Sequence, residues 1–227
     1  MAEFLAKTPR FAVEVEETFT EVNDGEPKIE LTNVRRAAVE RPNHVAADAT
    51  GDTLNRAAWY DGRSVTVLDK DHNVYATIEG AATIDATLDK LEDDYGVVLP
   101  FADLFYSDPY AVLTEDVTYG RYLGLHLAAG ALCHHLVFAQ QTIEWQIWID
   151  AGDEPLPRKF VITYVQEPGE PQYTAVVRRW ALNPTLPEGL FTFEAPEGAT
   201  KIDAKAIVRK PSESDKPREG GEAKGGR

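Results

Sequence analysis

The chain has 227 residues, 43% of them hydrophobic, which is enough to bury the core of a single domain. An excess of 38 acidic over 23 basic residues gives a formal net charge of −15. Because phosphate binding needs a basic surface, this charge excludes nucleic acid as the expected partner and argues against docking on an anionic membrane. No apolar run is long enough to span a bilayer, so we expect no stable membrane insertion.

The first eighty residues predict a meander of antiparallel strands, because apolar and polar side chains alternate along them. The first such run extends from Phe11 to Phe19. Hairpin or strand-breaking signals follow at Asn23-Asp24-Gly25, Arg41-Pro42-Asn43 and Asp61-Gly62. The expected strands cover residues 11–20, 28–40, 44–50, 57–60, 65–67 and 74–78.

The hydrophobic period then changes to that of a helix. Thr83 is the expected N-cap of this helix, and Gly96 is its expected end. Pro100 opens a short second helix, and Asp108-Pro109 opens a third that extends to about Asp116. The apolar faces of the first two helices are formed by Ile84, Leu88, Leu91 and Tyr95 and by Phe101, Leu104 and Phe105.

Strands are expected again over residues 119–127, 131–140, 143–150, 159–165 and 173–182, with a last short strand over 190–193. In the run 143–150, Trp145 and Trp148 fall on opposite faces because side chains alternate along a strand. A sheet with one apolar face must cover that face, and the helices between the two groups of strands are the available cover. The pattern therefore predicts a mainly β fold with helices, of the α+β class.

Several short motifs occur over residues 4–203: Tyr60-Asp61-Gly62, Thr83-Ile84-Asp85, Leu99–Leu104, Cys133-His134-His135, Glu144–Ile149, Leu156–Lys159, Val161-Ile162-Thr163 and Pro171-Gln172-Tyr173. In this combined spacing the chain resembles a bacterial family of predicted periplasmic proteins of unknown function, which is similar to the Lol-type lipoprotein carriers. The resemblance implies a strongly curved antiparallel sheet, an unclosed half-barrel, with helices plugging its concave face. It also implies a periplasmic location, and we expect a leader and part of the first helix to precede Met1.

The expected domain organisation is one half-barrel domain over residues 1–209 and a disordered tail over residues 210–227. The tail contains no large apolar residue, so it cannot offset the entropy of ordering its backbone. We therefore expect the tail to be dispensable for folding.

For function, the resemblance implies a periplasmic carrier or binding protein for a lipid, a lipoprotein acyl chain or another amphiphile, held in an apolar pocket under a helical lid. We expect no cofactor and no enzymatic activity, since the chain lacks the G-x-S-x-G, P-loop and G-x-G-x-x-G motifs. The alternative is a non-catalytic envelope scaffold with a filled core, marked by Trp148 on the second face. A hydrolase is a third hypothesis without a motif. The expected pocket residues are Trp145, Ile147, Phe160, Ile162 and Tyr164 of the sheet and Leu88, Leu91, Tyr95, Leu104 and Phe105 of the helices.

Two polar features have competing interpretations. Cys133, His134 and His135 suggest metal or nucleophile chemistry, but a strand places only Cys133 and His135 on one face. A zinc site needs three or four ligands, and a Cys–His nucleophile needs a third group that orients the base, so two residues form neither site. We therefore expect a packed cysteine with exposed imidazoles. The arginine doublets 35–36 and 178–179 lie on expected strands, so one member of each should face inward. In the carrier superfamily an inward arginine helps to hold the lid closed, but we assign that role to none of these four. We expect instead arginines at a sheet edge that pair with surface acids.

Overall fold

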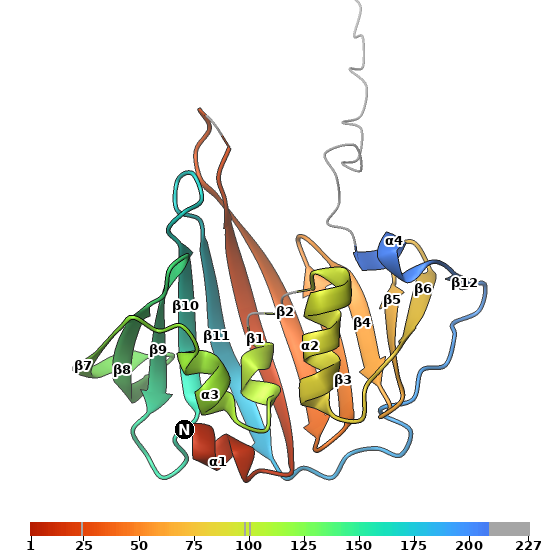
Figure 1. Ribbon diagram of the computed structural model, residues 1–227, viewed down its shortest axis with the longest axis horizontal. Coiled ribbons are helices and arrows are strands. Elements are labelled where there is room, and N and C mark those ends of the chain that lie inside the picture. Colours follow the sequence, from red (N-terminus) through yellow and green to blue (C-terminus); the bar gives the residue numbers. More distant parts are fainter. Residues whose placement is uncertain (24, 98, 100, 209–227) are drawn as a thin grey trace, which may run out of the picture.

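The computed structural model describes residues 1–208 apart from positions 24, 98 and 100. The predicted tail over residues 210–227 lies outside the described residues. One twelve-stranded sheet and five short helices make up the described part of the chain (Figure 1). The strands are β1 (Arg10–Glu21), β2 (Ile29–Glu40), β3 (His44–Gly51), β4 (Asn55–Tyr60), β5 (Ser64–Asp69), β6 (Val74–Glu79), β7 (Tyr119–Ala128), β8 (Ala131–Ala139), β9 (Ile143–Asp150), β10 (Pro157–Tyr164), β11 (Gln172–Leu182) and β12 (Thr200–Lys201). The helices are α1 (Ala2–Ala6), α2 (Ile84–Tyr95), the 3-10 helix η1 (Ala102–Phe105), α3 (Pro109–Thr114) and α4 (Ala204–Val208).

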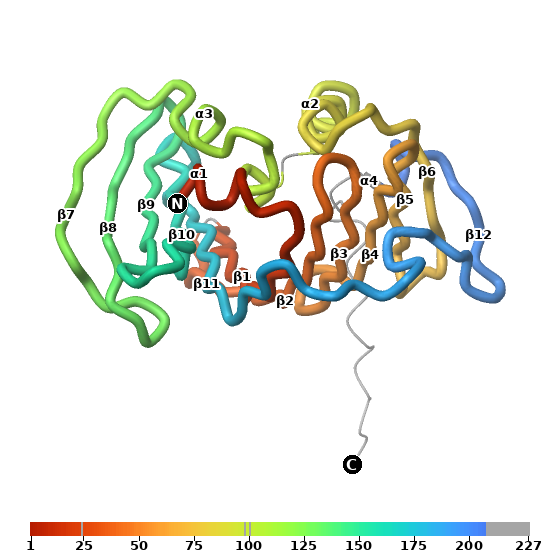
Figure 2. Tube along the Cα trace, turned by 90° about the horizontal axis from the view of Figure 1, so that it is seen from below, coloured from red at the N-terminus to blue at the C-terminus, as the bar shows by residue number. Residues whose placement is uncertain are grey.

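The sheet consists of two antiparallel meanders. Strands β1 to β6 form the first and β7 to β11 form the second, and the pairing of β1 with β11 joins them. The short strand β12 adds to β6 in parallel at one edge, while β7 forms the other edge, so the sheet is not closed. Figure 2 shows the strands as a trough, with α2 and α3 lying across its open side and α1 inside it. The expected half-barrel with helices on its concave face is confirmed.

Capping residues mark the ends of the helices. The Thr83 hydroxyl accepts a hydrogen bond from the backbone N–H of Ala86 at 3.2 Å and so caps α2. Gly96 ends α2 in the left-handed conformation, at φ 66°. The Asp108 carboxylate caps α3 in the same way through the N–H of Ala111, at 3.1 Å. Helix α3 ends at Thr114, two residues earlier than predicted, and Asp116 beyond it adopts a positive φ of 56°.

The half of the sheet formed by β1 and β8 to β11 has a densely filled core. Trp145 stacks on Phe138 with ring centroids 4.1 Å apart and meets Phe160 at 5.4 Å. Phe11 and Trp180 place their rings 5.7 Å apart on the neighbouring strands. Buried residues of α1, η1 and α3 complete the same cluster, and α3 packs against both α1 and η1. These three helices therefore plug this half of the trough.

The prediction of a strand over residues 190–193 is wrong. That segment belongs to the irregular connection that carries the chain from β11 to the far edge at β12. Prolines at positions 184, 187 and 196, on both sides of the segment, interrupt the connection with residues that lack a backbone donor. The Phe193 ring instead packs against Trp59 at 5.1 Å and Tyr75 at 4.9 Å, which anchors the connection to the sheet.

The alternation rule holds for one arginine doublet and fails for the other. Arg35 faces the concave side, where it pairs with Glu17, and the more exposed Arg36 pairs with Glu14. In the second doublet both arginines, residues 178 and 179, are exposed. The register of β1 with β11 shifts between Glu14 and Val15, so a β-bulge adds one residue to β11 and turns both side chains to solvent.

Candidate functional site

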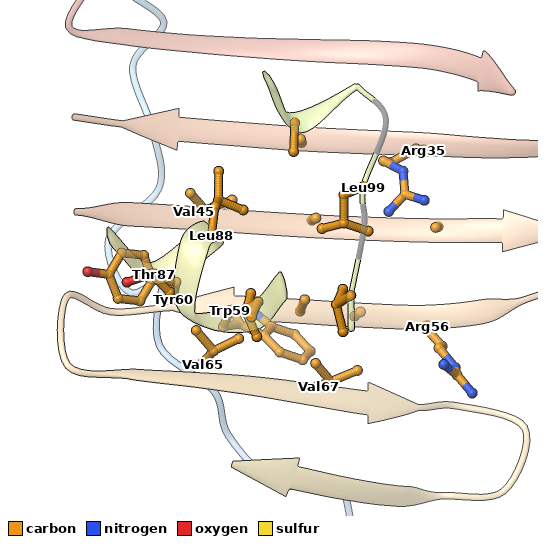
Figure 3. A pocket seen from close by; sticks show the side chains of 18 of the residues that line it. Arg35, Val45, Arg56, Trp59, Tyr60, Val65, Val67, Thr87, Leu88 and Leu99 are labelled. Atoms are coloured by element: carbon orange, nitrogen blue, oxygen red, sulfur yellow. The ribbon is translucent and has the colours of Figure 1, made fainter. Parts of the chain in front are cut away.

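A cavity of about 280 Å³ lies between α2 and the half of the sheet formed by β2 to β6 (Figure 3). Helix α2 and the segment that follows it cover the cavity from the open side of the trough, and α4 contributes to one wall. Of the described residues that line it, Glu17, Arg35 and Arg56 are charged. The lining consists mainly of alanine, valine, leucine and isoleucine residues, with aromatic side chains from Tyr60, Phe101 and Phe105.

A row of small side chains creates this space. Ala37 of β2 pairs in register with Ala47 of β3, and Ala47 pairs with Ala58 of β4. Side chains at directly paired positions share one face of a sheet, so three alanines lie next to one another below α2. Leu88 and Leu91 of α2 line the cavity from above. Alanine side chains are too short to reach α2, so the space that larger side chains would occupy between the sheet and this helix stays empty.

One end of the cavity is closed by polar anchors. Tyr60 lies in the row beside Val45 and Val65, and its hydroxyl donates to the backbone carbonyl of Ala81 at 2.7 Å. The N–H of Ala81 donates in turn to the Thr87 hydroxyl at 3.0 Å, which ties the first turns of α2 to the sheet. Figure 3 shows Tyr60 and Thr87 together at this end.

The opposite end carries two arginines, as Figure 3 also shows. Nε of Arg35 donates to Oε1 of Glu17 at 2.9 Å, and the Tyr173 hydroxyl donates to the same oxygen at 3.0 Å. The Glu17 side chain is only 3% exposed. Burial tends to lower the pKa of Arg35, but the Glu17 carboxylate outweighs it and raises that pKa. Burial together with Glu17 raises the pKa of Tyr173 well above its ordinary range, so both partners stay protonated.

The segment after α2 is held against the sheet by Arg41, which follows β2. The Arg41 guanidinium donates to the backbone carbonyls of Leu104 and Phe105, the second of which lines the cavity. Its charge lies over the Phe11 ring, 5.7 Å from the centroid. Burial lowers the pKa of Arg41, while the charge of Asp85 opposes that shift. The η1 segment is therefore tied to the turn between β2 and β3.

The contact between η1 and α2 is acidic. The Ser107 N–H and hydroxyl donate to the Asp85 carboxylate, and the Tyr106 hydroxyl donates to Asp89 at 2.9 Å. Burial, with a smaller contribution from the charge of Glu92, raises the pKa of Asp103 from 3.8 to about 6. The charge on this interface therefore changes in the mildly acidic range.

The structure separates the predicted pocket residues into two groups. Leu88, Leu91 and Phe105 line the cavity. Leu104 and the sheet residues belong to the filled cluster under α1, η1 and α3 or pack against it, while Tyr95 is half-buried near the end of α2. The predicted residues outside the cavity lining are Trp145, Ile147, Phe160, Ile162, Tyr164, Leu104 and Tyr95. That any of the ten contacts a ligand stays a prediction.

The Cys133-His134-His135 motif is divided between the two faces of β8. The Cys133 thiol is buried, which raises its pKa, as does the nearby charge of Asp150. His135 is also buried, contrary to the expected exposure, because it stacks on Trp148 at 4.0 Å between ring centroids. His134 is exposed and lies 3.0 Å from the Tyr122 hydroxyl. Within the described residues, no three His, Cys, Asp or Glu side chains converge as metal ligands would.

The chain thus forms an open antiparallel half-barrel with helices on its concave face. The chain belongs to the DUF2092 family of predicted periplasmic proteins, whose model matches residues 1–205. The expected resemblance and the periplasmic location are thereby confirmed. No curated protein shows significant similarity to this chain.

Several solved structures have a similar fold. An uncharacterized conserved protein from Thermus thermophilus is 12% identical with a TM-score of 0.51, over 88% of this chain and 97% of its own. The lipoprotein LppX of Mycobacterium tuberculosis is 11% identical with a TM-score of 0.43, over 81% and 92%. A LolA superfamily protein from Nitrosomonas europaea is 11% identical with a TM-score of 0.39, over 85% and 96%. Across the described residues, no helix has the length and apolar character needed to cross a membrane.

Proposed function

We propose that this protein is a periplasmic carrier or binding protein for a lipid, an acylated protein or another amphiphile, whose hydrocarbon chain occupies the cavity between α2 and strands β2 to β6. The observation that supports the proposal is the apolar cavity of about 280 Å³ above the row formed by Ala37, Ala47 and Ala58. Binding sites for apolar ligands are concave, mostly apolar and largely preformed.

The cavity volume indicates the size of the chain. An apolar protein cavity of about 150 Å³ accommodates one benzene molecule, which has six carbon atoms. At that density the present cavity holds roughly ten carbon atoms, the length of a medium acyl chain or of part of a longer one. The ligand would replace contacts that the alanines do not make, so binding would recover dispersion and hydrophobic energy that the unliganded protein lacks.

The proposed function does not require the protein to catalyse a reaction. Binding and release would depend on α2 and the segment after it moving relative to the sheet, since these elements cover the cavity. The acidic surface, with a net charge of −15, would keep the loaded protein in solution.

The test uses decyl maltoside, an uncharged amphiphile with a ten-carbon chain, below its micelle concentration. At a concentration 100 times its dissociation constant it should stabilise the native state by about 2.7 kcal/mol, which corresponds to a rise in Tm of about 5–10 °C. Ala47→Leu should abolish this rise because leucine fills the cavity, whereas Ala38→Leu should retain it. Ala38 is the matched control, since it neighbours Ala37 and faces the opposite side of β2. A wild-type Tm that does not respond, or a response that Ala47→Leu leaves intact, would remove the proposal.

A specific observation favours one alternative, a non-catalytic interaction module. The edge strand β7 and its neighbour β8 expose large apolar side chains, with Leu127 at 78% and Leu132 at 49% exposure directly paired. An extended peptide segment could add to the free edge of β7. This function predicts that decyl maltoside leaves the Tm unchanged, so the same experiment separates the two.

A further inference from the structure

The two arginines of the cavity lie in one row across the sheet. Arg35 of β2 pairs in register with Ala49 of β3, and Ala49 pairs with Arg56 of β4. Two strand spacings of about 4.8 Å place the Cα atoms of the arginines roughly 10 Å apart. All three residues line the cavity, so a small side chain lies between two long cationic ones at its end.

We propose that these two arginines bind the anionic head group, a carboxylate or phosphate, of a single-chain amphiphile whose tail lies over the alanine row. This inference rests on the proposed function and names the class of ligand. The geometry of guanidinium groups matches the oxygen pairs of carboxylates and phosphates, which they bind through two parallel hydrogen bonds.

The Arg35 side chain makes fewer hydrogen bonds than its donors allow. Its Nε donates to Glu17, and this is the one hydrogen bond that the Arg35 side chain makes among the described residues. Glu17 and Tyr173 fix the guanidinium from behind, because Oε1 of Glu17 accepts from both. An arginine held in this way loses little side-chain entropy when it binds an anion.

Arg56 is also incompletely satisfied. Its single hydrogen bond among the described residues is a long one, 3.4 Å from Nη2 to Oδ2 of Asp69. The other oxygen of Asp69 accepts from His72, through both its backbone N–H and its ring. Asp69 is thus shared between two partners, and most of the Arg56 donors make no hydrogen bond within the part of the chain that the structure describes.

The acids near this row do not prevent an anion from binding. Glu17 and Asp69 offset the two positive charges, but one oxygen of each is already engaged by an arginine. Oε2 of Glu17 is buried and has no hydrogen-bond partner among the described residues. A protonated head group or a hydroxyl beside the anion would supply the donor that this oxygen lacks.

The outer face of the sheet provides the contrast. Arg36 is the sequence neighbour of Arg35, but it points away from the cavity and pairs with Glu14 at 2.7 Å. Its side chain is 60% exposed, so it has water as an alternative partner. Arg36 therefore serves as a matched control for any loss of charge at the cavity.

Isothermal titration calorimetry with decanoate, decyl phosphate and decanol tests the inference on the full chain. Each anionic ligand should bind at least tenfold more tightly than decanol, because only the anions offer a negative charge and a pair of acceptor oxygens to the guanidinium groups. Arg56→Met should reduce the affinity for decanoate about tenfold and leave decanol unchanged, and Arg36→Met should change neither. Acetate and inorganic phosphate should bind far more weakly than decanoate and decyl phosphate, because they lack the tail.

Arg35→Met alone would leave Glu17 buried without its partner, so the second variant is the double change Glu17→Gln with Arg35→Met. It should lose the preference for decanoate over decanol while still binding decanol. Equal affinity of wild type for decanoate and decanol would overturn the head-group inference and leave the proposed function standing. Failure of every decyl ligand to bind would overturn both the head-group inference and the proposed function. Binding of inorganic phosphate as tight as that of decyl phosphate would show an anion site without a lipid tail and overturn the inference.

Discussion

Replacement of Asp103 by asparagine should stabilise the protein at neutral pH. Asp103 lies in η1, and its pKa is raised from 3.8 to about 6, first by burial and then by the charge of Glu92 on α2. A carboxyl group whose pKa is higher in the folded state favours folding when it is protonated and disfavours folding when it is ionised. Its contribution is therefore fully present below about pH 4 and is lost as the pH rises through about 6.

The pKa values give the magnitude. A difference of one pKa unit corresponds to 1.36 kcal/mol, so ionising Asp103 in the folded protein costs up to about 3 kcal/mol. Asparagine is a neutral side chain of the same shape and does not ionise. The variant should exceed the wild type in unfolding free energy by up to about 3 kcal/mol at pH 7.5, with the difference falling towards zero near pH 4.

Urea unfolding between pH 4 and pH 7.5 measures this difference through the midpoint concentration at constant slope. Asp93→Asn is the matched control, because Asp93 is an exposed residue of α2 and its replacement should change stability by less than about 0.5 kcal/mol at every pH. A difference between Asp103→Asn and wild type that does not vary with pH would refute the reasoning. So would a variant that is less stable than wild type at pH 7.5.

Two further predictions concern folding stability. Arg41→Met should lower the unfolding free energy by about 1–3 kcal/mol, because the carbonyls of Leu104 and Phe105 lose their donors. The control Arg36→Met should lower it by less than about 1 kcal/mol. Equal urea midpoints for the two variants would contradict the role of Arg41. Removing residues 210–227 should leave the Tm unchanged, because their composition lacks core-forming side chains; a fall of many degrees in a thermal scan would show that the tail contributes to the fold.

The secondary structure was predictable because its signals are local. Alternation with period two identified both meanders, and the change to helical spacing at Ile84 identified α2, with Thr83 and Gly96 at its ends. The errors lie where a longer-range contact determines the conformation. The β-bulge of β11 follows from its pairing with β1, and the two-residue strand β12 exists only because β6 offers a free edge.

The position of the cavity was not predictable in the same way. Periodicity shows which face a side chain occupies, but it does not show how much of the facing volume is filled. The aromatic residues around Trp145 indicated a lipid site, yet their rings stack on one another and fill their half of the trough. The useful signal was the opposite one, alanines at positions 37, 47 and 58 where inward-facing strand residues are usually larger.

Under the proposed function, the anchors of α2 predict the end of the cavity at which a ligand would enter. At the first turn of α2, the N–H of Ile84 donates to the carbonyl of Pro42 at 2.9 Å, and Thr87 accepts from Ala81. Among the described residues, the last turn of α2 makes no hydrogen bond to the sheet, and Leu99 beyond it is 38% exposed. A helix held to the sheet at its first turn moves most at its last turn, which leads to Leu99, and Figure 3 shows Leu99 near Arg35. A tail that enters there would pass the arginines first, and its head group would come to rest beside them at the cavity entrance.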